Sequence, residues 1–104
     1  MNAKPVLDEF RRELHSLYGE RLKDFILFGS YARGDAHTRS DIDVMVVLGS
    51  EVAPGREIDR MIDVITELNL KYGVLLSVVP AAEEKYLRRN SPLLLNVRRE
   101  GVPA

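Results

Sequence analysis

Two aspartates separated by one residue are the first candidates for chemistry in this sequence. Asp41 and Asp43 lie at the start of an apolar run, Ile42 to Leu48. In an extended strand, residues i and i+2 project from the same face, so these carboxylates should lie close together. Paired carboxylates repel each other unless a cation lies between them, and Mg²⁺ takes such oxygen ligands while leaving positions for phosphate oxygens. The alternative is a solvated strand entrance, but the valine-rich run favours a buried strand with a fixed polar end.

A glycine and a serine form the second candidate feature. The short apolar run Phe25 to Phe28 ends at Gly29, where a glycine permits a sharp turn and the close approach of a ligand. Ser30 then lies at the N-terminus of a short helix, where unpaired N–H groups and the helix dipole favour phosphate oxygens. Taken alone, the pair is more commonly a turn with a capping serine. Arg33 either reaches a phosphate oxygen or pairs with Asp35 at the surface.

The remaining polar residues of this region predict little chemistry of their own. The chain has two histidines, His15 and His37, which lie far apart in the sequence, so a zinc site is not expected. His37 and Arg39 belong to the loop before the aspartates, where we expect exposure to solvent.

The elements that must position these groups follow from hydrophobic periodicity and from the glycines and prolines that interrupt it. The predicted elements, in order, are an amphipathic helix over Pro5 to Tyr18, a strand over Phe25 to Phe28, a turn or short helix over Ser30 to Ala36, a strand over Ile42 to Leu48, an amphipathic helix over Glu57 to Tyr72, a strand over Val74 to Val79 closed by Pro80, a helix over Ala81 to Arg89, and a last helix that begins at Ser91-Pro92 and ends at Gly101. This order predicts an α/β (α+β) domain with a small mixed β-sheet flanked by helices.

The bulk composition limits the classes of function. The 104 residues are predicted to form one domain, residues 1–104, and the net charge of −1 argues against extensive contact with nucleic acid. Because the sequence has no cysteine, disulfides and thiolate metal sites are excluded. We find neither a signal peptide nor an apolar stretch long enough to cross a membrane, and therefore expect a cytoplasmic protein. The composition is compatible with a monomer or an oligomer.

The polar residues together form a longer motif. Gly29-Ser30, ten residues, and then Asp41-x-Asp43 resembles the signature of the nucleotidyltransferase superfamily related to DNA polymerase beta. The additional Ala32-Arg33-Gly34 and Ser40 resemble its minimal nucleotidyltransferase branch, whose members have about this length. The resemblance implies the polymerase beta-like nucleotidyltransferase fold. It also implies the site residues: nucleotide binding by Gly29, Ser30, Arg33 and Ser40, and a catalytic, Mg²⁺-binding pair formed by Asp41 and Asp43.

The resemblance further implies a reaction and a partner. Members of the family transfer a nucleoside monophosphate from a nucleoside triphosphate to a hydroxyl and release pyrophosphate, so the implied substrate here is a nucleoside triphosphate, with ATP favoured over the other nucleotides. Minimal members often accompany a HEPN-domain protein as a toxin–antitoxin pair. The implied function is transfer of AMP to a hydroxyl of such a toxin.

One residue departs from the family pattern. Active members usually carry a third carboxylate on the next strand, whereas the only polar residue of the strand Val74 to Val79 is Ser77. A neutral hydroxyl is a poor metal ligand and does not act as a base near pH 7. The acidic residues that could substitute, Asp63, Glu83 and Glu84, are expected at the surface. The second hypothesis is therefore an antitoxin that neutralises its partner by direct binding, with a nucleotide site that is vestigial or regulatory.

The C-terminal segment leaves two interpretations open. Leu93 to Leu95, with Val97 and Val102, are more apolar than one buried helix face requires, which fits either packing against the sheet or a protein interface. Two basic pairs, Arg88-Arg89 and Arg98-Arg99, are expected on solvated helix faces, although they could also line a triphosphate channel or meet an acidic partner.

Overall fold

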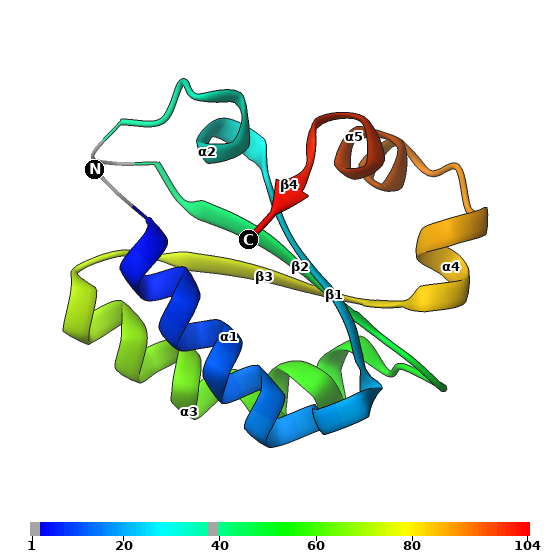
Figure 1. Cartoon of the computed structure of the whole chain (residues 1–104), viewed down its shortest axis with the longest axis horizontal. Helices are drawn as coiled ribbons and strands as arrows, with labels where there is room; N and C mark the ends of the chain where they lie inside the picture. Colours follow the sequence, from blue (N-terminus) through cyan, green and yellow to red (C-terminus); the bar gives the residue numbers. More distant parts are fainter. Residues whose placement is uncertain (1–2, 38–39) are drawn as a thin grey trace.

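The structure is a computed structural model that describes residues 3–37 and 40–104. Helices and strands alternate along most of the chain (Figure 1). The elements, in order, are α1 (Lys4–Tyr18), the 3-10 turn η1 (Gly19–Arg21), β1 (Leu22–Phe28), α2 (Gly29–Arg33), β2 (Ile42–Leu48), α3 (Pro54–Tyr72), β3 (Leu76–Ala82), α4 (Glu83–Arg88), α5 (Pro92–Glu100) and β4 (Val102–Pro103).

The strands of the described residues form one mixed sheet in the order β3-β2-β1-β4. β1 is antiparallel to both β2 and β4, whereas β3 is parallel to β2. A parallel neighbour requires a crossover connection, which α3 provides between β2 and β3. The register places Asp43 of β2 between Phe28 of β1 and Ser77 of β3. The predicted fold class, a small mixed sheet flanked by helices, is confirmed.

The helices cover the two faces of the sheet unequally (Figure 1). α1 and α3 pack on one face against alternate residues of β2, namely Val44, Val46 and Leu48. The intervening residues Met45 and Val47 face the other side, where the buried cluster also includes Val97 of α5 and is much smaller. This alternation follows from the two-residue period of a strand. By the same period, Asp43 belongs to the face that carries α4 and α5.

Helix ends are set by local sequence signals. α1 and α3 each have a proline in the first turn, and they end at Gly19 and Gly73, whose φ angles are +53° and +64°. The Ser91 hydroxyl accepts a hydrogen bond from the Leu94 N–H and so caps α5, as predicted. Across residues 3–37 and 40–104, no helix combines the length and the apolar character that a bilayer crossing requires.

The third strand differs from its prediction. β3 runs from Leu76 to Ala82, so it begins later than Val74 and passes through Pro80 instead of ending before it. The position of β3 at the sheet edge explains this, because a residue without an N–H is tolerated in an edge strand. The predicted helix from Ala81 accordingly begins at Glu83. Strand β4 was not predicted, because its two residues carry no periodic pattern.

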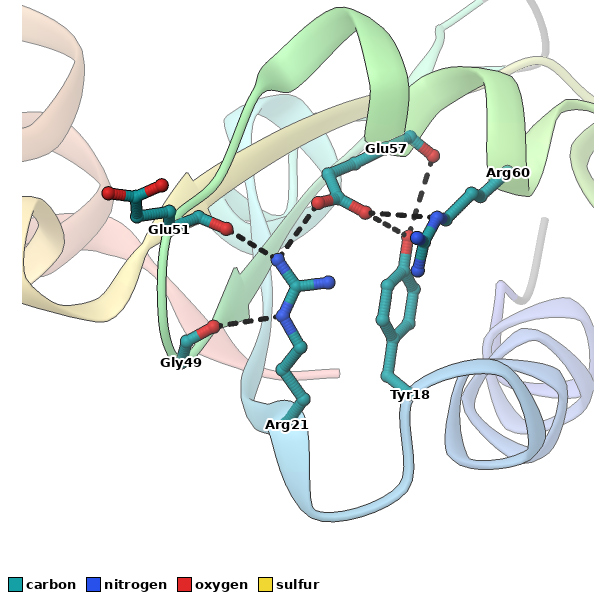
Figure 2. Close-up of polar contacts among 6 residues, drawn as sticks. All are labelled: Tyr18, Arg21, Gly49, Glu51, Glu57 and Arg60. Carbon is teal, nitrogen blue, oxygen red and sulfur yellow. Dashed lines mark hydrogen bonds and ion pairs between the residues drawn. The ribbon is translucent and has the colours of Figure 1, made fainter.

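A buried ion pair joins the start of β1 to the start of α3 (Figure 2). Glu57 is only 3% exposed, and its carboxylate accepts hydrogen bonds from Arg21 at 2.9 Å and from the Tyr18 hydroxyl at 3.1 Å. Arg21 also donates to the backbone carbonyl oxygens of Gly49 and Glu51, at 3.0 and 2.6 Å. These contacts hold the β2–α3 loop against η1, at the end of β2 that lies away from Asp43.

Candidate functional site

Asp41 and Asp43 occupy the N-terminal end of the central strand. Asp43 is the second residue of β2 and is half-buried, whereas Asp41 precedes the strand and is exposed. Burial raises the pKa of Asp43 above its ordinary value, and the negative charge of Asp41 raises it further. The structure therefore brings the two predicted carboxylates close enough to repel each other, as their spacing suggested.

Ser77 occupies the position beside Asp43 on the neighbouring strand. The register of β2 and β3 pairs Asp43 with Ser77, and hydrogen bonding by the Ser77 hydroxyl lowers the pKa of Asp43, which partly opposes the effects of burial and of Asp41. The hydroxyl thus stabilises the charged form of Asp43 but adds no charge of its own. Among residues 3–37 and 40–104, no group of three acidic or histidine side chains is placed to hold a metal ion.

Gly29 lies directly against the carboxylate of Asp43. It has a φ of +71°, a left-handed conformation that favours glycine. A Cβ at this position would overlap Asp43 Oδ2. Sequence reasoning explained Gly29 by the sharp turn and the close approach of a ligand. The structure adds a second reason, which is that the Asp43 side chain occupies the space where any other residue would place its Cβ.

Ser30 and Arg33 come from α2, the short helix that begins at Gly29. Ser30 is half-buried in its first turn. Arg33 is paired with Asp35 at 3.3 Å, which was one of the two predicted alternatives, and also with Glu100 at 3.4 Å. Its positive charge also lowers the pKa of Asp43, so the guanidinium lies within electrostatic range of the aspartates. All three residues of this pairing are exposed or half-buried, and ion pairs of this kind contribute little to stability.

Ser40 organises the loop that leads to the aspartates. Its hydroxyl accepts a hydrogen bond from the His37 N–H at 3.0 Å, and its own N–H donates to the His37 carbonyl oxygen at 2.9 Å. His37 is exposed, as predicted. The prediction for Arg39 lies outside the described residues. The two hydrogen bonds thus join Ser40, the residue immediately before Asp41, to His37.

The donor set at the aspartates fits a divalent cation. The two carboxylates at the start of β2 offer oxygen ligands with a combined negative charge, and a cation between them would relieve the repulsion that adds to the effect of burial on the pKa of Asp43. In proteins generally, Mg²⁺ is bound by one or two carboxylates together with substrate phosphates and water. The pair therefore suits a metal that arrives with a nucleotide better than a metal caged by protein ligands alone.

Sequence reasoning missed Glu100 as a neighbour of this site. It lies 67 residues after Arg33 and pairs with it because α5 packs beside α2. No sequence pattern indicates this contact, since it depends on how α5 crosses the sheet. The last residue of α5 therefore contacts a residue of the candidate nucleotide site.

The acidic residues considered as substitutes for a third carboxylate lie elsewhere. Asp63 is exposed on α3, the helix that covers the opposite face of the sheet. Glu83 and Glu84 line a hollow of about 710 Å³ at the far end of β2, next to the Arg21–Glu57 pair. These positions agree with the surface roles that were predicted for them.

The prediction for Arg98 is wrong. Arg98 was expected on a solvated helix face, but its guanidinium donates to the carbonyl oxygens of Tyr86 and Arg89, at 2.5 and 2.7 Å, and to Asn90 Oδ1 at 2.7 Å. The residues it contacts lie in α4 and in the turn between the last two helices. Arg98 therefore fastens α5 to α4, because a planar guanidinium can satisfy several carbonyl groups at once.

Comparison with known protein sequences gives one family and several relatives. The family model described as "Nucleotidyltransferase domain" matches residues 7–98. A protein of Methanocaldococcus jannaschii named "Putative protein adenylyltransferase MJ0604" is 41% identical over 102 residues, which cover 97% of this chain and 96% of that protein. A second protein of the same organism is named "Putative protein adenylyltransferase MJ0141". It is 34% identical over 76% of this chain and 79% of its own length.

Solved structures share the fold. A crystal structure described as a toxin–antitoxin with AMP-PNP contains a chain that superposes with a TM-score of 0.65 and is 22% identical, over 93% of this chain and 70% of that chain. At this level of identity, the likeness establishes a common architecture.

Proposed function

Because the chain belongs to the nucleotidyltransferase domain family, we propose that it transfers AMP from ATP to a hydroxyl of a protein partner, with Asp41 and Asp43 as the catalytic, Mg²⁺-binding pair. The observation that carries this proposal is the contact between Gly29 and the Asp43 carboxylate. This contact lies between Gly29-Ser30 and Asp41-x-Asp43, the two halves of the sequence motif, at one end of β2. The name of the 41% identical relative supports a protein acceptor.

The proposed roles follow the positions of the side chains. The hydroxyl of Ser30, at the start of α2, binds a phosphate oxygen, and Arg33 exchanges its partners Asp35 and Glu100 for the triphosphate. Ser40 holds the loop that positions Asp41, next to the nucleotide. Asp41 and Asp43 hold Mg²⁺, which when bound neutralises charge that develops on the phosphates.

The bonds that change are those at the α-phosphorus of ATP. The acceptor oxygen forms a bond to this phosphorus, while the bond from phosphorus to the pyrophosphate oxygen breaks in line with the attack. Pyrophosphate leaves with the electron pair of the broken bond, and the acceptor hydroxyl loses its proton to solvent or to a neighbouring base. The products are AMP joined to the acceptor through a phosphodiester, pyrophosphate and one proton.

We also propose the kind of partner. A minimal nucleotidyltransferase of this length suits the antitoxin of a toxin–antitoxin pair, and its acceptor would be a HEPN-type toxin. The proposal is supported by the shared fold of a solved toxin–antitoxin structure, together with the resemblance of residues 29–43 to the minimal branch.

A second function is favoured by one observation. Ser77 occupies the strand position beside Asp43, where the family usually places a third carboxylate, and a hydroxyl does not replace its charge. An antitoxin that neutralises its partner by contact, while retaining a nucleotide site, would have no need for that carboxylate. The two functions differ in whether AMP is transferred.

The experiment uses ATP labelled at the α-phosphate, with Mg²⁺ and a co-purified partner. We expect label on the partner with the wild-type chain and with Asp63→Asn, a matched acidic substitution on the exposed surface of α3, and none with Asp43→Asn. Equal transfer by Asp43→Asn would refute the assignment of the site. If no variant transfers label, while the partner binds Asp43→Asn as tightly as wild type, the chain is a contact antitoxin.

A further inference from the structure

The face of the sheet that carries Asp43 continues into an apolar groove. On β2 the residues that share this face after Asp43 are Met45 and Val47, and their partners on β3 are Val79 and Ala81. Met45 and Val79 line a groove of about 220 Å³ between the strands and the start of α5. Two strand positions separate Asp43 from Met45, which is about 7 Å along the strand. The groove therefore begins about 7 Å from Asp43 and continues towards Val52 and Pro54, at the other end of β2.

The groove is apolar, and the chain segment that forms one of its walls carries a net positive charge. Lys85 is the one charged residue among those that line it, and Leu93 and Leu94 of α5 form one wall. The segment from residue 83 to residue 100, which contains α4 and α5, has five Lys and Arg against three Asp and Glu, although the whole chain has a net charge of −1. Five cations against three anions give this segment a net charge of +2, opposite in sign to that of the whole chain, although Arg88 pairs with Glu84 and Arg98 binds backbone carbonyl oxygens.

Large apolar side chains of α4 and α5 are left in solvent. Leu87 of α4 is 63% exposed, and Leu93 of α5 is 42% exposed at the mouth of the groove. Leu95 is also exposed, so the apolar C-terminal segment noted in the sequence is only partly used in packing, through Val97 and Leu94. An exposed leucine that lines an apolar groove is typical of a protein interaction surface.

Helix α5 connects this groove to the nucleotide site. It begins beside the groove with Leu93 and ends at Glu100, which pairs with Arg33. A partner that lies along α5 would therefore contact the groove at one end and reach the phosphate-binding region at the other. The nine residues of α5 span about 14 Å, a distance that a single peptide segment covers.

We infer that the α4–α5 face, defined by the groove with Leu93 and by the exposed cations Lys85, Arg89 and Arg99, is the docking surface for the protein acceptor, and that the acceptor binds it through an acidic segment with large apolar side chains. This inference rests on the proposed function, because it places the acceptor of that reaction. The apolar side chains fill the groove, the acidic groups face Lys85 and the other exposed cations, and the acceptor hydroxyl lies towards Asp43.

The test uses a defined probe, a fluorescein-labelled amphipathic peptide of about 16 residues, built from glutamate, alanine and leucine with leucines at helical spacing. Binding is followed by fluorescence anisotropy. We expect the peptide to bind the wild-type chain, and to bind Leu93→Asp about tenfold or more weakly. Leu70→Asp is the matched control, because Leu70 is 80% exposed on α3, away from this face. Its affinity should equal that of the wild type.

A second peptide, in which every glutamate is replaced by lysine, tests the charge. We expect it to bind about tenfold or more weakly than the acidic peptide at low salt. The inference is overturned if the acidic peptide does not bind, if Leu93→Asp binds it as well as Leu70→Asp does, or if the lysine peptide binds equally well. It is also overturned if sedimentation shows a dimer that Leu93→Asp abolishes, because a second copy then occupies the groove.

Binding of a non-hydrolysable ATP analogue with Mg²⁺, measured on the same variants, separates this inference from the proposed function. Leu93→Asp should leave analogue binding unchanged, since Leu93 lies at the groove and not at the aspartates. If the analogue fails to bind any variant while the peptides behave as expected, the proposed function is wrong and the docking surface stands. If the analogue binds normally and the peptides do not, the docking surface alone is wrong.

Discussion

Replacing Gly29 with alanine tests whether the Gly29–Asp43 contact positions the catalytic aspartate. The added Cβ would overlap Asp43 Oδ2, so either the carboxylate or the start of α2 must move. Gly34 provides a matched control in the same part of the chain. It also has a positive φ, +81°, but a Cβ there would meet nothing within 4 Å. Both alanine variants therefore place an L-residue at a positive φ, which is unfavourable in each. Only Gly29→Ala adds a steric conflict with Asp43.

The expected magnitudes follow from these two effects. An L-residue in the left-handed region costs about 1–2 kcal/mol, which both variants incur. Gly29→Ala adds an overpacking cost of about 1–3 kcal/mol from the displaced carboxylate. Since each kcal/mol lowers the Tm of a domain near this size by about 4–8 °C, Gly29→Ala should unfold at a clearly lower temperature than Gly34→Ala.

Binding of a non-hydrolysable ATP analogue with Mg²⁺, measured by calorimetry below both Tm values, supplies the functional readout. We expect Gly34→Ala to bind like the wild type and Gly29→Ala to lose Mg²⁺-dependent binding while remaining folded. If Gly29→Ala binds the analogue as tightly as Gly34→Ala does, the contact with Asp43 does not position a metal ligand, and the site must be assigned differently.

Three further predictions concern the buried contacts. Glu57→Gln should lower the free energy of unfolding by about 2–3 kcal/mol in urea titrations, because the 3% exposed carboxylate accepts a charged hydrogen bond from Arg21; a loss below about 0.5 kcal/mol would contradict this view. Burial and the hydrogen bond to Glu57 raise the pKa of Tyr18 to about 12. An unfolded tyrosine ionises near pH 10, so the contribution of Tyr18 to stability is complete below about pH 10 and is lost as the pH rises towards 12, and Tyr18→Phe should flatten this part of the stability profile. Arg98→Ala should lower the free energy of unfolding by about 1–2 kcal/mol and leave binding of the ATP analogue unchanged, whereas a clear loss of nucleotide affinity would place Arg98 in the triphosphate channel.

Features with a local physical cause could be predicted from the sequence. The helix near Pro5 to Tyr18 and the strand from Ile42 to Leu48 have the bounds that their periodicity predicts, almost to the residue. The cap at Ser91 and the helix end at Gly73 were also predicted, because each depends only on a few neighbouring residues. The proximity of Asp41 and Asp43 belongs to the same class, since the two-residue period of an extended strand imposes it.

Predictions failed where a residue's neighbours come from distant parts of the chain. Pro80 was expected to end a strand, and it does not, because the position of β3 at the sheet edge removes the need for its N–H. Arg98 was expected in solvent, and it instead binds carbonyl groups that α4 and the following turn bring to it. Neither outcome has a local signal.

The residue types of the candidate site, and the spacing of its two halves, were determined by the sequence alone. Tertiary structure decided how these halves meet: Gly29 against the Asp43 carboxylate, Ser77 beside Asp43 in the strand register, and Glu100 against Arg33. The physical reason is that strand pairing and helix packing join residues across long stretches of chain, and these contacts are selected by the burial of the whole core. Local backbone geometry places groups along one element, and only packing places one element against another.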